Sequence, residues 1–301
     1  MASFRNSRSR RLRVREFFIE SFLFLSACLA VIATAGIVFI LFYESIGFFR
    51  EVSLIEFFTG TEWSPLFSNP KYGILPLLAG TLTTTFVALA FAIPVGTVAA
   101  IYLSEYAPNR FREIVKPILE LLAAVPTVVY GYFALLFVTP MLQKIFPTLP
   151  GFNMLSAGLV IGIMIIPYIS SLSEDAMRAV PMQMREGAYA LGSTKFQTAV
   201  RVVFPGAFSG ITSAYILGIS RAVGETMVVA IAAGMQPNFT LNPAEPAATI
   251  TAYIVQVSLG DLPHGSIGYQ SIFAAGLLLL LITFFFNILG FFLRKKFRER
   301  Y

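Results

Sequence analysis

The sequence contains very few of the residues from which disulfides and metal sites are built. Its 301 residues include one cysteine, Cys28, and one histidine, His264. A single cysteine forms no disulfide within the chain, and neither residue supplies a multi-thiolate or multi-histidine metal site. We therefore expect no bound metal and no cofactor. His264, in "DLPHGS", is expected to be a solvated loop residue.

Sequence patterns typical of enzymes are also lacking. The pattern G-x-x-x-x-G-K-[ST], which cradles nucleotide phosphates, occurs nowhere, so the chain cannot hydrolyse ATP by that chemistry. No pair of carboxylates or nucleophile–base set stands out, and no His/Asp/Glu cluster lies in an apolar run. We predict that the chain is not an enzyme. If it drives uphill transport, the energy must come from a partner or an ion gradient.

Charge is scarce as well. Charged residues make up 13% of the chain and hydrophobic residues 56%, whereas soluble domains are roughly 25% charged. A helix needs about 20 apolar residues to cross a bilayer, and the chain has six apolar runs of about that length or more. It is therefore predicted to be an all-α integral membrane protein with six transmembrane helices. These form one domain, 17–293, between basic tails 1–16 and 294–301. The predicted spans are 17–43, 74–103, 118–140, 154–173, 206–234 and 267–293.

The first apolar run resembles a secretion signal in part. Six arginines precede it, and "ATA" at 33–35 looks like a signal-peptidase site. The run continues to residue 43, however, and is too long for the apolar region of about 7–15 residues in a signal peptide. We predict an uncleaved first helix.

The basic residues predict the orientation in the membrane, because Lys and Arg are retained in cytoplasmic loops. With six spans, 18 of the 22 Lys and Arg residues fall on the side that holds both termini. Three fall on the other side (Arg50, Lys71 and Lys144), and Arg221 lies within a span. Both termini and segments 104–117 and 174–205 are therefore expected to be cytoplasmic. The net charge of +6 is then a topology signal, and we expect no nucleic-acid partner, while anionic lipid attracts this side.

Prolines lie deep in three of the predicted spans. Pro94, Pro126 and Pro167 occur in the second, third and fourth runs, where proline is expected to kink the helix. Such kinks fit either ordinary packing or helices that bend around a central pathway. In the outer segment 44–73, the only tryptophan, Trp63, is expected to be an interfacial anchor.

Arg221 and Glu225 stand within the fifth apolar run, in "GISRAVGETMVVAIAAGM" (218–235). Ionised side chains are costly in a bilayer and mark functional sites by default. On one continuous helix, a four-residue spacing places the two side chains on one face, where they can pair. Residue chemistry alone leaves two roles open: a structural ion pair, or a place on a transport pathway.

Segment 174–205 is unusually long for a loop between membrane helices. Its periodicity predicts two short helices, "MQMREGAYAL" and "TKFQTAVRVV", broken at Gly192. Glu186, Gly187 and Ala188, then Gly192 and "VVFP" (202–205), match the spacing EAA-x3-G-x9-I-x-L-P with mild substitutions. That pattern resembles the EAA motif of ABC importer permeases, in which the loop forms a coupling helix that docks on the ATP-hydrolysing subunit.

Further stretches are similar to phosphate permeases of the PstC type. They include "FFTGTEWSP" (57–65), "ELLAAVPTVVYGYFAL" (120–135) and "SRAVGETMVVAIAAG" (220–234). The resemblance implies a type I (MetI-like) importer fold in the bacterial plasma membrane. It also implies pairing with a homologous permease of the PstA type, two ATPase subunits and an external phosphate-binding protein.

The resemblance also implies roles for the two intramembrane charges. Inorganic phosphate would pass Arg221, whose guanidinium suits phosphate oxygens, while Glu225 would hold Arg221 in place and temper its charge. The alternatives are an ABC permease for another oxyanion, such as sulfate or molybdate, or an ion-coupled secondary transporter or channel with Glu225 as a proton site.

Overall fold

The computed structural model describes residues 2–65, 67, 69–260, 262–263 and 265–296, and these are mostly helical. His264 and residues 297–301 of the basic C-terminal tail lie outside the described residues, so the expectation for His264 is not tested. The elements are α1 (Ala2–Glu51), α2 (Leu54–Thr59), α3 (Leu75–Ile101), the π-helical η1 (Tyr102–Tyr106), α4 (Asn109–Ala123), α5 (Thr127–Phe133), η2 (Ala134–Val138), α6 (Thr139–Ile145), α7 (Met154–Arg178), α8 (Met182–Ala190), α9 (Lys195–Thr198), η3 (Ala199–Val203), α10 (Phe204–Gly206), α11 (Phe208–Val223), α12 (Met227–Ala232), α13 (Ile250–Ser258) and α14 (Ile267–Lys296).

The prediction of a helical membrane protein is confirmed. Among the described residues, five helical segments are long and apolar enough to cross a membrane: Arg15–Glu51, Leu75–Tyr106, Thr127–Ile145, Met154–Arg178 and Ile267–Lys296. A sixth is possible from Lys195–Gly206 and Phe208–Val223, two pieces bent by 73° relative to each other. The count of six therefore depends on treating these two pieces, which are separated by Ala207, as one span.

The third span differs from its predicted position, 118–140. α4 ends at Ala123, and Pro126 is the residue that caps the start of α5, so the span runs over Thr127–Ile145. The residue before a proline avoids the helical conformation, and Pro126 therefore separates two helices instead of kinking one. Pro94 and Pro167 do lie inside helices, α3 and α7.

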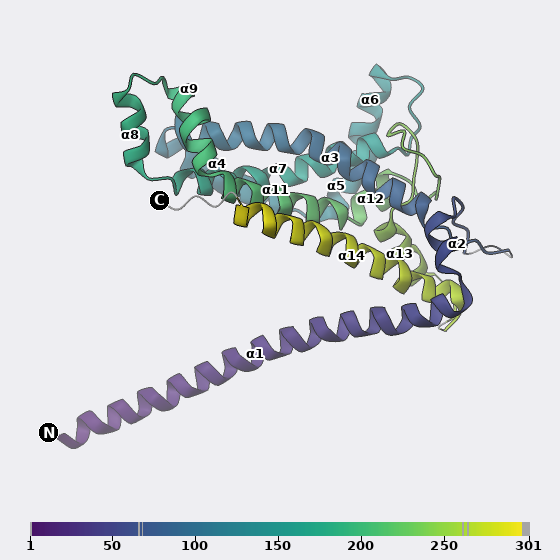
Figure 1. Cartoon of the computed structure of the whole chain (residues 1–301), viewed down its shortest axis with the longest axis horizontal. Helices are drawn as coiled ribbons and strands as arrows, with labels where there is room; N and C mark the ends of the chain where they lie inside the picture. The colour runs from purple at the N-terminus through teal and green to yellow at the C-terminus, as the bar shows by residue number, and fades with distance from the viewer. Residues whose placement is uncertain (1, 66, 68, 261, 264, 297–301) are drawn as a thin grey trace.

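Helices α3 and α7 pack closely against each other within the bundle (Figure 1). Gly158 makes this possible, because a Cβ there would lie 2.6 Å from Val87 Cγ1 and 3.1 Å from the Thr84 carbonyl oxygen. Small residues let membrane helices approach at backbone distance. The largest apolar core, which includes Met164, Ile165 and Val229, gathers around this contact.

An aromatic core closes one end of the bundle. Trp63 is 3% exposed and packs edge-on against Phe57, Tyr72 and Tyr253, with the Tyr253 ring centroid 5.0 Å away. The expectation that Trp63 is an interfacial anchor is therefore wrong. Its bridge to Tyr72 closes segment 63–72 on itself, and its contact with Tyr253 holds this segment against α13. We call this end the α13 end.

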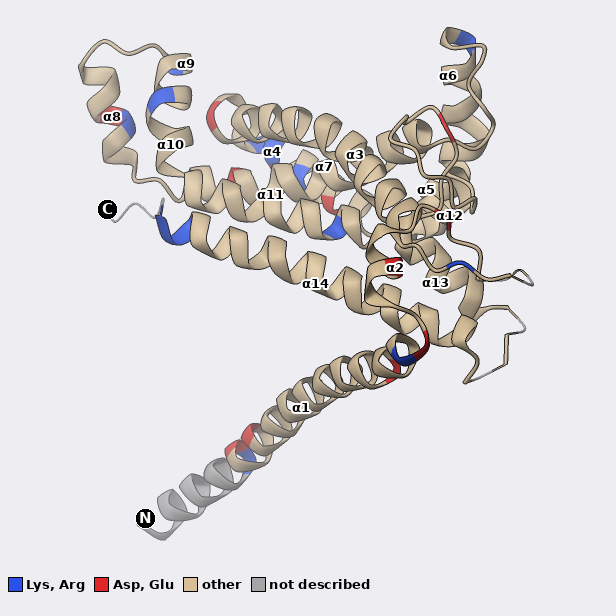
Figure 2. Ribbon diagram, turned by 45° about the vertical axis from the view of Figure 1, so that its right-hand side comes forward, with Lys and Arg blue, Asp and Glu red and all other residues tan. Residues whose placement is uncertain are grey.

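Helix α1 leaves the bundle at the α13 end and points back as a separate arm (Figure 1). None of its most apolar stretch is buried within the chain. Figure 1 shows its start on the same side as α8, α9 and the end of α14. Figure 2 shows basic residues on α8, on α9 and at the end of α14. We call that opposite side the α8 end.

Candidate translocation and coupling sites

Three residues, Gly224, Glu225 and Thr226, interrupt the fifth predicted span between α11 and α12. The Glu225 carboxylate accepts hydrogen bonds from the Met227 and Val228 N–H groups at 3.1 and 3.3 Å, as a capping side chain does. The Glu225 carbonyl oxygen accepts from the Thr251 hydroxyl at 2.7 Å. Membrane helices break only where such partners satisfy the freed backbone groups.

The predicted pairing of Arg221 with Glu225 on one continuous helix is wrong. A four-residue spacing aligns two side chains only while the helix continues, and α11 ends at Val223. No ion pair of Arg221 is found among the described residues. Its guanidinium carbon instead lies 4.5 Å from the centroid of the Tyr168 ring, within range of a cation–π contact.

Polar groups without partners surround this break. The Arg221 Nε and the Ser220 hydroxyl are buried and make no hydrogen bond. Leaving a buried donor unpaired costs about 1–3 kcal/mol, so each group would be stabilised by a polar partner. Ser220 and Arg221 belong to the wall of a cavity of about 440 Å³, which is formed by Thr127, Ser220, Arg221, Gly224, Glu225, Thr226 and Met227.

The sequence prediction missed two residues near Arg221. Thr127, from α5, lines the cavity. Tyr168, from α7, lies against the Arg221 guanidinium, and its hydroxyl donates to the Ala123 carbonyl oxygen at 3.2 Å. Ser220, Gly224 and Thr226 were detectable candidates, since each lies next to Arg221 or Glu225 in the sequence. Nothing local in the sequence indicates that Tyr168 faces Arg221, because the packing of α7 on α11 decides it.

The two-helix prediction for segment 174–205 is confirmed. α8 ends at Ala190, and α9 begins at Lys195 with a capping box between Thr194 and Gln197. Gly192, at φ +81°, makes the turn between them, a conformation that residues with a Cβ rarely adopt. The motif residues divide by exposure: Glu186, Gly187 and Gly192 are exposed, whereas Ala188 is buried.

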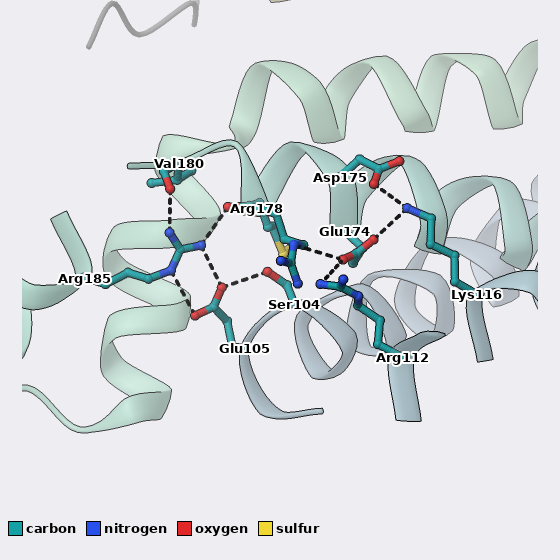
Figure 3. Close-up of polar contacts among 10 residues, drawn as sticks. Ser104, Glu105, Arg112, Lys116, Glu174, Asp175, Arg178, Val180 and Arg185 are labelled. Carbon is teal, nitrogen blue, oxygen red and sulfur yellow. Dashed lines mark hydrogen bonds and ion pairs between the residues drawn. The ribbon is translucent and has the colours of Figure 1, made fainter. Parts of the chain in front are cut away.

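Arg185 anchors α8 to the membrane bundle (Figure 3). Its residue surface is 8% exposed. Nη2 and Nε donate to the two Glu105 carboxylate oxygens at 3.0 and 3.3 Å. Nη1 donates to the Val180 carbonyl oxygen at 2.5 Å, and Nη2 also to that of Met177 at 2.8 Å. The guanidinium thus joins α8 to η1 and to the end of α7.

A second ionic cluster lies beside it, between α4 and α7 (Figure 3). The buried Glu174 carboxylate faces Lys116 at 3.0 Å, Arg178 at 3.7 Å and Arg112 at 3.8 Å. Lys116 also pairs with Asp175. Although burial alone lowers the pKa of Lys116, its hydrogen bonds to Asp175 and Glu174 raise the pKa above the ordinary value. Since α4 has no buried residue, this cluster is a main attachment of α4.

A helical bundle with a broken span, a polar cavity at the break and a projecting two-helix loop defines a membrane permease subunit. Residues 92–299 match the family model described as "Binding-protein-dependent transport system inner membrane component". The chain belongs to this family, and the resemblance inferred from the sequence is confirmed. Its relatives are transport subunits of the bacterial inner membrane, not enzymes.

Relatives match over most of the chain. It is 35% identical to the probable ABC transporter permease protein YqgH of Bacillus subtilis, covering 88% of this chain and 86% of that protein. It is 36% identical to the phosphate transport system permease protein PstC of Xylella fastidiosa, covering 76% and 75%. The PstC of Mesorhizobium japonicum is 32% identical, with 92% and 90% covered.

Solved structures support the fold. The bacterial ABC transporter for alginate import has a chain that matches with a TM-score of 0.63 at 16% identity, covering 92% of this chain and 96% of that one. The methionine ABC transporter MetNI, in an inward-facing conformation, gives 0.54 at 18% identity, covering 75% and 95%. The MetI-like importer fold predicted from the sequence is confirmed.

Proposed function

We propose that this chain is a transmembrane subunit of an ATP-driven importer of inorganic phosphate and forms half of the translocation pathway. The observation that supports the proposal most directly is Arg221, with a buried and unpartnered Nε, at a polar cavity within a broken membrane span. The similarity to proteins named PstC supports phosphate as the substrate.

The chemistry of the cavity suits a tetrahedral oxyanion. The planar guanidinium offers paired donors that match phosphate oxygens, and the hydroxyls of Ser220 and Thr127 add neutral donors on the same wall. Glu225 lines this wall and lowers its net positive charge. Such a balance lets an anion enter without being held too tightly to leave, as conduction requires.

The exposed part of α8 is the surface proposed to dock on an ATPase subunit. Glu186 and Gly187 are free of the bundle, and a Cβ at Gly187 would meet no atom within 4 Å, so the surface is open to a partner. Ala188 packs inward, and Gly192 sets the turn. In this proposal the α8 end faces the cytoplasm, in agreement with the basic residues expected there.

Three further partners complete the proposed importer. They are a homologous permease of the PstA type, a second ATPase subunit and an external phosphate-binding protein. The apolar surface of α1, exposed in the isolated chain, would meet lipid or the second permease. Within this arrangement one cavity at Arg221 supplies the cationic lining for this half of the pathway.

The test is uptake of labelled phosphate by cells that lack their own importer and express this system. We expect Arg221→Gln to abolish uptake while the ATPase still co-purifies, and Arg221→Lys to retain only part of it, because lysine keeps the charge but loses the fork. Lys144→Gln, which removes a cation outside the cavity, is the matched control. Normal uptake by Arg221→Gln would refute the pathway role. Uptake of sulfate and not phosphate would overturn the substrate.

A further inference from the structure

Both helices of the loop at the α8 end contact the same short segment, η1, at the end of the second span. From α8, Arg185 forms a two-point ion pair with Glu105. From α9, the Lys195 Nζ lies 4.9 Å from the centroid of the Tyr106 ring. A cavity of about 440 Å³ opens beside these contacts and is lined by residues of the loop and of η1, including Glu105, Arg185 and Lys195.

The link through Arg185 is the stronger of the two. Its guanidinium donates to four acceptor oxygens that belong to Glu105, Met177 and Val180. The Glu105 side chain is 5% exposed and also accepts from the Ser104 hydroxyl at 2.8 Å. Each charge is therefore desolvated and depends on the other, which makes such a pair costly to open. Lysine, with one nitrogen, cannot reach all of these acceptors.

Arg185 lies next to the motif residues in α8, on a different side of the helix from Glu186. Arg185 directly precedes Glu186 in α8, and successive helical residues differ by about 100° in direction. Glu186 is exposed whereas Arg185 is buried. One side of the helix is thus open to a partner, while the adjacent side holds η1 and the end of α7.

We propose that Arg185 is a positioning residue that transmits displacement of α8 to η1, and through η1 to the second span. This inference rests on the proposed function, since it requires an ATPase subunit that docks on α8. The two-point pair makes α8 and η1 move together, so that a push on α8 is not absorbed in the loop. η1 is π-helical, a geometry common at functional sites.

The experiment uses the complete importer with its binding protein in proteoliposomes, and measures phosphate taken up per ATP hydrolysed. For Arg185→Gln, Arg185→Lys and Glu105→Gln we expect the ATPase to co-purify, because the exposed face of α8 is unchanged. We expect uptake per ATP to fall by roughly tenfold or more, the size associated with loss of a charge-assisted hydrogen bond. Glu105→Asp, which keeps the charge but shortens the side chain, should give an intermediate value.

Two controls separate transmission from general damage. Arg201→Gln removes an exposed cation from the same loop and should leave uptake per ATP unchanged. The double variant Arg185→Gln with Glu105→Gln should be no worse than Arg185→Gln alone, because residues that act through one contact are not additive.

Distinct results would overturn the inference. Normal uptake per ATP in assembled Arg185→Gln and Glu105→Gln complexes would refute it. Loss of ATPase co-purification in these variants would assign Arg185 to the docking surface and also refute it. If Arg185→Gln fails to fold, phosphate uptake per ATP hydrolysed by the Arg185→Lys and Glu105→Asp complexes is the deciding measurement, and normal values in both would refute the inference. Absence of an ATPase from the wild-type complex would instead refute the proposed function.

Discussion

Replacement of Glu174 by glutamine is a direct test of how α4 is held to the bundle. Glu174 is 1% exposed, and three cations, Arg112, Lys116 and Arg178, lie within 3.0–3.8 Å of its carboxylate. Glutamine keeps the size of the side chain but removes the charge. Among the described residues, Lys116 then keeps an ion pair, with Asp175, while Arg112 and Arg178 lose the one that they make with Glu174.

The expected cost follows from distance and exposure. At 3.0 Å and an effective dielectric constant of about 20, the attraction between Lys116 and Glu174 is about 5–6 kcal/mol. Desolvation of both ions offsets much of it, and breaking a fully buried pair costs about 3–5 kcal/mol. The cation side chains are 20–44% exposed, so solvent screens part of the effect. We expect a loss of about 2–3 kcal/mol in the free energy of unfolding.

The measurement is denaturant unfolding of the purified chain in detergent. Glu113→Gln is the matched control, since Glu113 lies exposed on α4 and should change stability by less than about 0.5 kcal/mol. Raising the salt concentration should reduce the deficit of Glu174→Gln, because salt screens the repulsion among the exposed cations. A Glu174→Gln variant as stable as the control would show that the cluster does not hold α4.

Three other predictions concern packing, the cavity and pH. Gly158→Val should destabilise the chain by about 1–3 kcal/mol through overpacking against Val87 and Thr84. Gly36→Val is the control and should not, because a Cβ at Gly36 meets nothing within 4 Å. Equal unfolding curves for the two variants would contradict close α3–α7 packing. Tyr168→Leu should reduce phosphate uptake more than Tyr168→Phe, since phenylalanine keeps the ring over Arg221, and equal losses would point to the hydroxyl instead. The pKa of Lys116 is raised in the folded state. Its contribution to the free energy of unfolding is therefore fully present below the unfolded-state pKa of about 10.4 and is lost as pH rises through the folded-state pKa. The stability difference between wild type and Lys116→Met should be constant from pH 7 to 9 and shrink only in stronger alkali.

Part of the candidate site was predictable because it depends on short-range spacing. The two helices of segment 174–205 followed from local periodicity and from Gly192, whose positive φ makes the turn between them. Arg221 was detectable because a charge in an apolar run is unusual. The predicted pairing of Arg221 with Glu225 was wrong because it assumed one continuous helix, whereas α11 stops at Val223, directly before Gly224, a residue that commonly ends helices.

Composition and the order of residues by themselves determined the class of this protein. Apolar runs longer than a bilayer requires, scarce charge and basic residues confined to particular segments can only be satisfied by helices in a membrane. The motif spacing that indicated an importer permease is likewise a property of the chain alone. These features need no knowledge of which helices touch.

Tertiary structure alone decided how the charges are used. The break at Glu225 is tolerated because Thr251, from α13, satisfies its carbonyl oxygen, and Arg221 lies against Tyr168 because α7 packs on α11. Arg185 pairs with Glu105, which lies eighty residues away in the sequence. Most buried polar groups have a partner, but which part of the chain supplies that partner is set by packing, and packing between distant segments leaves no periodic pattern in the sequence.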